Sequence, residues 1–172
     1  MSFFLTALAF TLPQEGLLSN EAADLGGPTN RGITQATLDY ARNKIPGLPA
    51  AVDVLTDAET QTIYQVLFWN EIGGESLPDW AALAVFDGAV NSGPGAATRW
   101  LQAALGVTQD GSIGPQTLAA LTAAEPRGVL REFNARRLYT MMHQTPTELS
   151  AFGLGWARRV MLCHDTAAAL IP

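Results

Sequence analysis

The sequence predicts an all-α protein, because apolar residues recur with helical spacing along most of its 172 residues and no segment shows the strict alternation of a half-buried strand. Its composition, 48% hydrophobic and 15% charged, is typical of a folded domain with a sizeable core. A short hairpin within residues 16–31 would make the fold α+β, since Gly26-Gly27 and Asn30-Arg31-Gly32 are turn sequences.

Start signals locate the helices. Ser2 is a candidate N-cap for the first helix, Thr34 is one for the second, and Thr56 with Glu59 forms a capping-box pattern for the third. Pro115 is well placed as the first residue of a later helix. The expected helices cover residues 2–11, 35–43, 56–69, 80–91, 96–105, 115–124, 127–142 and 152–170.

Helix breakers separate these segments. Pro13 is expected to disrupt or kink the first helix, and Gly73-Gly74 ends the third. The segment 80–91 is apolar nearly all round, which predicts a central buried helix. We therefore expect one domain over residues 1–172, with approximate sub-regions 1–72, which holds the candidate catalytic motif, and 79–172, which is helical.

Charge and cysteine content exclude several function classes. The net charge is −6, with −7 in residues 1–100 (four Lys or Arg against eleven Asp or Glu) and +1 in residues 101–172 (six against five). An acidic chain without a basic block is a poor partner for nucleic acid or anionic membranes. Cys163 is the only cysteine, and the two histidines are far apart in sequence, so neither an intramolecular disulfide nor a metal site is expected.

The N-terminal apolar run spans about ten residues without a basic n-region, so it is interpreted as a buried helix and not as a signal peptide. No segment approaches the roughly 18 apolar residues that a membrane span needs.

Two carboxylates, Glu15 and Asp24, are the candidate catalytic groups. Glu15 ends an apolar helix beside a glycine, which suits a general acid, and Asp24 lies among hydroxyl and amide groups that would keep it ionised. Glycosidic bond hydrolysis needs two carboxylates in contrasting environments, and a threonine hydroxyl such as that of Thr29 could orient the attacking water. The spacing alone also fits a turn-rich surface loop with incidental acids.

Beyond the spacing, the residues resemble a known signature. Glu15-Gly16, followed by Asp24-x-Gly26-Gly27-x-Thr29-Asn30-x-Gly32-Ile33-Thr34, resembles that of glycoside hydrolase family 108, the lysozyme-like N-acetylmuramidases of phage endolysins and bacterial genomes. The segments V-F-D-G-A-V-N-S-G-P (85–94), L-Q-A-A-L-G (101–106), D-G-S-I-G-P-Q-T-L (110–118), A-R-R-L-Y (135–139) and F-G-L-G-W-A-R-R-V (152–160) resemble the predicted peptidoglycan-binding region of that family.

The resemblance implies a lysozyme-type α fold of two lobes with a cleft, and cleavage of the β-1,4 bond between N-acetylmuramic acid and N-acetylglucosamine. Its catalytic glutamate falls on Glu15. Asp24 and Thr29 are carried over because their spacing also resembles the Glu/Asp/Thr arrangement of phage lysozymes. The sequence departs from the family at Leu17-Leu18, where an aromatic residue is usual, and this puts substrate preference in doubt.

Three further residues are candidates for substrate binding. Asn91 lies four residues after Asp87 on the expected buried helix, so the two side chains share one face. Two roles are open for Asn91: it binds a sugar N-acetyl group, or it braces a buried polar network. Tyr64 and Trp69 flank a glycine-containing turn, where they line a sugar subsite or pack as core aromatics.

The leading hypothesis from sequence is therefore a peptidoglycan muramidase of the phage or prophage endolysin type. Its alternatives are a lytic transglycosylase that uses the same acid, and a non-catalytic wall-binding or structural module. The expected partner is bacterial peptidoglycan, met by a monomer that is made in the cytoplasm without a classical signal peptide. It would reach the periplasm and wall through a holin, an injection apparatus or another route. Hydrolysis of the glycosidic bond needs no cofactor, and none is expected.

Overall fold

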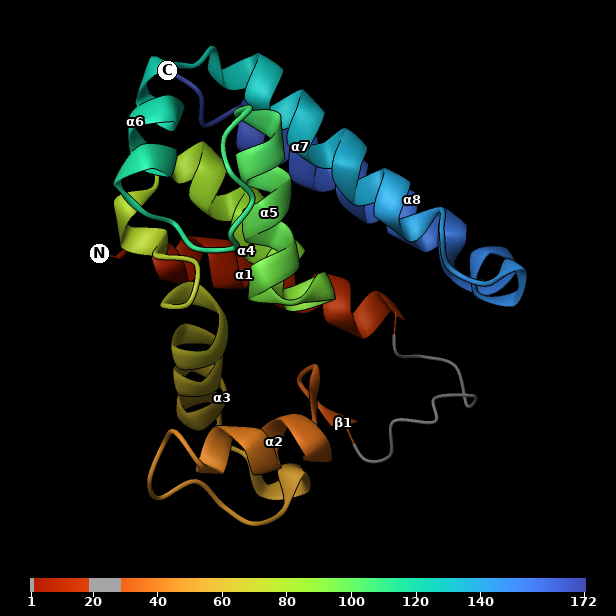
Figure 1. Ribbon diagram of the computed structural model, residues 1–172. Coiled ribbons are helices and arrows are strands. Elements are labelled where there is room, and N and C mark those ends of the chain that lie inside the picture. The colour runs from red at the N-terminus through yellow and green to blue at the C-terminus, as the bar shows by residue number, and fades with distance from the viewer. Residues whose placement is uncertain (1, 19–28) are drawn as a thin grey trace.

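The computed structural model describes residues 2–18 and 29–172 and is mostly helical, with one two-stranded hairpin (Figure 1). The predicted fold class is confirmed. The elements, in chain order, are α1 (Phe3–Leu18), β1 (Thr29–Asn30), β2 (Ile33–Thr34), α2 (Gln35–Arg42), η1 (Val52–Val54), α3 (Asp57–Tyr64), η2 (Gln65–Trp69), η3 (Gly74–Ser76), α4 (Asp79–Ser92), α5 (Pro94–Ala104), α6 (Pro115–Ala123), α7 (Pro126–Met141) and α8 (Pro146–Ala168).

The elements fall into two groups joined by α3 and η2. Figure 1 shows the hairpin and α2 at one end of α3, and α1 with α4 to α8 at the other. The hairpin is antiparallel and pairs Thr29 with Thr34 and Asn30 with Ile33. Thr34 also caps α2 by accepting from the Thr37 backbone N–H, so one residue ends the hairpin and starts the helix.

Helix α4 is the centre of the larger group. Each residue from Trp80 to Ala89 is buried, which is why the segment is apolar nearly all round. It packs against α1, α5, α7 and α8. The Phe86 ring lies 5.9 Å from Phe4 of α1 and 5.6 Å from Trp69 of η2 (ring centroids), so one aromatic cluster ties three elements together.

The first helix differs from its prediction. Instead of ending near Thr11, α1 runs through Pro13 to Leu18. Proline removes one backbone donor but allows helical φ, and Phe10 and Leu12 in the turn before Pro13 pack against the core. Tertiary packing thus outweighs the local cost, and Glu15 lies within the last turns of the helix.

Two other helices also differ from their predictions. Helix α8 begins at Pro146, not Phe152, because Thr145 and Glu148 form a capping box that the sequence analysis missed. The helix expected over 56–69 begins with the predicted capping box, but its last five residues, Gln65–Trp69, form a π-helix. π-Helical segments are rare in proteins overall, and those that occur are often found at functional sites.

Within the described ranges, no helix is both long enough and apolar enough to cross a membrane.

The aromatic cluster predicts a large loss of stability in Phe86→Ala, by about 3–5 kcal/mol, because truncation leaves a cavity between three elements. Chemical denaturation measures the free energy of unfolding. The control Leu154→Ala removes a side chain that is 65% exposed and should change stability by less than about 0.5 kcal/mol. Similar losses in both variants would contradict the central role of the cluster.

Candidate functional site

Glu15, near the C-terminal end of α1, lies against a buried arginine of α8. Its Oε1 is 2.6 Å from Arg159 Nη1. The arginine side chain is only 2% exposed, whereas the carboxylate side chain is 19% exposed. One side of Glu15 is therefore held by the protein, and the remainder is open to a ligand.

Arg159 is itself held by a second carboxylate. Its Nε and Nη2 donate to Asp87 of α4 over 2.9–3.2 Å, and Arg137 Nη1 of α7 lies 2.7 Å from the other Asp87 oxygen. Two arginines and two carboxylates alternate, so the network is neutral when both acids are ionised. Pairing of this kind is what makes buried charge tolerable, since an isolated buried ion costs several kcal/mol.

The electrostatics follow from this pairing. Burial alone disfavours ionised Asp87, but the guanidinium groups of Arg137 and Arg159 outweigh it and hold the pKa of Asp87 below its ordinary value. Burial raises the pKa of the nearby Cys163 thiol. This cysteine therefore stays a neutral thiol at physiological pH, as expected of a structural residue.

The hairpin approaches Glu15 from the other side. Gly32 has a left-handed φ of +78°, and a Cβ added there would lie 2.6 Å from Tyr64 Oη and 3.0 Å from Glu15 Cβ. Only glycine fits so close an approach without displacing a neighbour. Tyr64 Oη also donates to the Arg31 carbonyl oxygen at 3.1 Å, which ties the turn of the hairpin to α3.

The sequence-predicted catalytic residues are placed unequally. Asp24 lies outside the described residues. Thr29 is exposed and opens the hairpin whose turn contacts Glu15. The structure thus brings Glu15 and the strand of Thr29 to the same part of the molecule.

Asn91 belongs to the buried network. Its Oδ1 accepts from Arg137 Nη2 at 3.4 Å, at the end of α4 where the side chain is partly exposed. This bracing contact matches one of the two roles considered from sequence.

Tyr64 and Trp69 are both 1% exposed. Trp69 donates its indole N–H to Glu75 Oε1 and packs in the aromatic cluster, and the Tyr64 hydroxyl is used by the hairpin. In this structure neither ring offers a face to a sugar.

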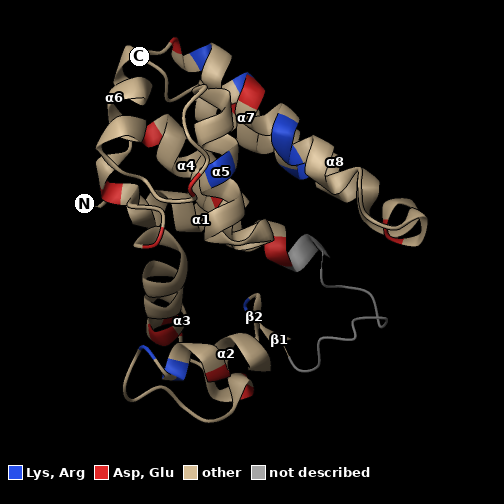
Figure 2. Cartoon of the chain, viewed as in Figure 1, with Lys and Arg blue, Asp and Glu red and all other residues tan. Residues whose placement is uncertain are grey.

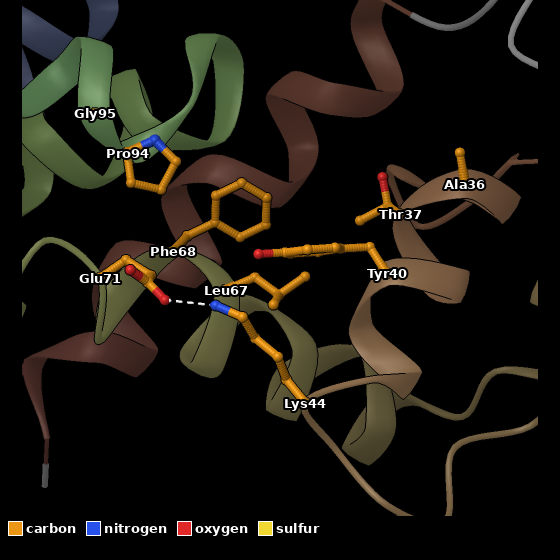
Figure 3. Close-up of a pocket in the computed structure, with 9 residues that line it drawn as sticks. All are labelled: Ala36, Thr37, Tyr40, Lys44, Leu67, Phe68, Glu71, Pro94 and Gly95. Carbon is orange, nitrogen blue, oxygen red and sulfur yellow. Dashed lines mark hydrogen bonds and ion pairs between the residues drawn. The ribbon is translucent and has the colours of Figure 1, made fainter.

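Sequence reasoning missed Arg159 and a pocket beside the site. The C-terminal basic residues lie mostly on α7 and α8 (Figure 2), and only the fold shows which of them point inward. The pocket, of about 580 Å³, lies between the two groups of elements. Figure 3 shows its lining residues, which are Ala36, Thr37, Tyr40, Lys44, Leu67, Phe68, Glu71, Pro94 and Gly95.

Among the residues that the structure describes, no group of three or more His, Cys, Asp or Glu is arranged to hold a metal ion.

Comparisons with known proteins show the family and the fold of the chain. A family model described as glycosyl hydrolase 108 matches residues 8–93, and one described as a predicted peptidoglycan domain matches residues 96–161. The solved structure of SagA from Brucella abortus is similar, with a TM-score of 0.84 and 35% sequence identity over 97% of this chain and 94% of that chain. A search of curated protein sequences found no significant match.

The buried network predicts that Asp87→Asn costs about 3–5 kcal/mol at neutral pH, because two buried arginines lose their shared counter-charge. Since the folded pKa of Asp87 lies below its unfolded value near 3.9, its contribution is present above that pH and is lost as pH falls. Denaturation from pH 7 to pH 2.5 should therefore show a smaller loss of stability in the variant than in the wild type.

The matched control is Asp165→Asn, which neutralises an exposed acid on α8. This variant should leave the unfolding free energy at neutral pH nearly unchanged, and also its decrease between pH 7 and pH 2.5. If the unfolding free energy of Asp87→Asn falls with pH as steeply as that of the wild type, Asp87 is not the ionised centre of the buried network.

Proposed function

We propose that the protein is an N-acetylmuramidase with Glu15 as its general acid. The chain belongs to the glycosyl hydrolase 108 family, and it is thus a glycoside hydrolase that acts on peptidoglycan. In this role Glu15 protonates the leaving oxygen of the β-1,4 bond between N-acetylmuramic acid and N-acetylglucosamine. The single observation that carries the proposal is the placement of Glu15, whose partly exposed carboxyl group is held beside a buried arginine.

Fixation matters because a general acid must meet its oxygen within hydrogen-bond reach. A free glutamate has three side-chain torsions, whereas Glu15 has one oxygen held at 2.6 Å by Arg159 and its Cβ held against the hairpin. Asp87 binds the other N–H groups of Arg159, so the arginine cannot swing away without leaving a buried carboxylate short of a partner. We assign Arg159 as a positioning residue for the acid.

Asp24 and Thr29 complete the proposed mechanism. Asp24 holds the attacking water or stabilises the oxocarbenium-like transition state, and the Thr29 hydroxyl assists it. Thr29 is supported by its place on the hairpin that contacts Glu15, and Asp24 by the motif alone.

The proposed biological setting is that of a phage or prophage endolysin, released or delivered to the wall after synthesis. The match to a peptidoglycan domain supports the wall as the target, and the phage setting rests on the resemblance of the sequence motif alone.

The acid role predicts that Glu15→Gln folds normally but releases reducing ends from purified sacculi at least about a thousandfold more slowly, since the amide N–H groups are not acidic enough to protonate the leaving oxygen. Circular dichroism and melting temperature check the fold. If mass spectrometry shows that the wild type releases 1,6-anhydro products, the reaction is lytic transglycosylation and not hydrolysis. Undiminished activity in the variant would contradict the role of Glu15.

The positioning role predicts that Arg159→Lys lowers kcat by about a hundredfold, because lysine cannot bind two carboxylates in one plane and a small misplacement of the acid is costly. KM should change far less than kcat, and the pH profile of kcat should shift. If activity falls only in proportion to the amount of folded protein, and the pH profile of kcat does not shift, Arg159 has a structural role only.

A further inference from the structure

The pocket between the two groups of elements lies next to the proposed catalytic site. Phe68 of η2 lines it, and the Phe68 ring is 5.5 Å from the Tyr64 ring, centroid to centroid. The Tyr64 hydroxyl in turn lies where Gly32 approaches Glu15. A glycan seated at Glu15 therefore has this pocket beside it, one layer of aromatic residues away.

One wall of the pocket carries a pair of opposite charges. Lys44, which follows α2, is the only lysine of the chain, and its Nζ lies 2.8 Å from Glu71 Oε1 (Figure 3). The two side chains are 37% and 47% exposed. An ion pair this exposed contributes little to stability, so a ligand that brings its own two charges can replace it at low cost.

The rest of the lining is mostly apolar, and its side-chain polar groups are the hydroxyls of Thr37 and Tyr40. Leu67, Phe68 and Pro94 present aliphatic and aromatic surface, and Tyr40 reaches across the pocket from α2 towards Phe68 (Figure 3). A ligand that fits must combine short apolar groups with one carboxylate and one ammonium close together.

The charge pair favours a peptide over a sugar. A neutral N-acetylated sugar offers no charge to either Lys44 or Glu71. The usual sugar platform would be the ring of Tyr40, but the Lys44 ammonium already lies 5.3 Å from the centre of that ring. The peptide stems of peptidoglycan carry alanine methyl groups, free carboxylates and, at an uncrosslinked diamino acid, a free ammonium.

We propose that this pocket binds the peptide stem of peptidoglycan, with Lys44 holding a stem carboxylate and Glu71 holding the ammonium of its diamino acid. The proposal rests on the function proposed above, because the stem enters together with the glycan that Glu15 cleaves. It makes the protein selective for peptide-bearing glycan. Pro94 and Gly95 at the start of α5 complete the pocket, so both groups of elements take part.

The kinetic test compares two substrates, peptide-bearing glycan strands and the same strands stripped of peptides by an amidase. The measured quantity is the ratio of kcat/KM on the first to kcat/KM on the second. Lys44→Met and Glu71→Gln are each expected to lower this ratio about tenfold, because each removes one charge-assisted hydrogen bond to the stem.

The double variant Lys44→Glu with Glu71→Lys restores an ion pair but reverses its direction. It is expected to keep the lowered ratio, whereas restoration of the wild-type ratio would show that the pair only ties the elements together. Glu132→Gln, which breaks the exposed pair with Arg136 on α7, is the matched control and should leave the ratio unchanged. An unchanged ratio in Lys44→Met, or equal losses on both substrates, overturns the proposal.

A binding test keeps this inference separate from the catalytic one. Reductive methylation with ¹³C-formaldehyde labels only Lys44 and the N-terminus and retains the positive charge. Titration of the full chain with a soluble stem tripeptide that ends in a diamino acid should shift the Lys44 signal saturably, and the same peptide with its amine acetylated should bind several-fold more weakly.

Absence of a shift at millimolar peptide overturns the stem site whether or not the protein cleaves glycan. If neither glycan substrate is cleaved at all, the proposed muramidase function fails, and the titration still decides the stem site.

Discussion

The structure depends on one buried guanidinium. Arg159 of α8 donates hydrogen bonds from Nε and Nη2 to Asp87 of α4 and forms an ion pair with Glu15 of α1, so three helices are fixed by a single planar cation. Arg137 of α7 completes the charge balance at Asp87. None of these charges is tolerable alone in the core, and this forces α7 and α8 to pack where they do. The geometry that stabilises the fold is therefore the same geometry that aims the carboxyl of Glu15 at the open side.

This network changes how the two matched regions relate to each other. Glu15 and Asp87 lie in the part that matches glycosyl hydrolase 108, whereas Arg137 and Arg159 lie in the part that matches a peptidoglycan domain. The C-terminal region thus supplies two of the four charged groups of this network, both of its arginines, instead of acting only as an appended binding unit. The boundary drawn from sequence between residues 72 and 79 stays a prediction about organisation, and the ion pair of Glu15 with Arg159 crosses it.

Much of the fold could be predicted from local signals. The caps at Thr34 and Thr56 and the all-round apolar helix over 80–91 are local in sequence, and each has its expected counterpart in the structure. The helix break expected at Pro13 was wrong, because core packing of the residues just before it outweighs the local cost of proline. In the site, the motif directed attention to Glu15, but its partner Arg159 is distant in sequence and looks like any helix-surface arginine. Aromatic content likewise cannot separate a buried ring such as Trp69 from an accessible one such as Tyr40, since both read as apolar residues on a helix.

The most direct test of the account is a crystal structure of Glu15→Gln bound to a peptidoglycan fragment that contains an intact muramic acid to glucosamine bond. The account predicts that the glycosidic oxygen lies within about 3.2 Å of the side-chain amide at position 15, with Arg159 still paired to Asp87. A glycan bound away from position 15, or an Arg159 that has left Asp87 to bind the sugar, would contradict it.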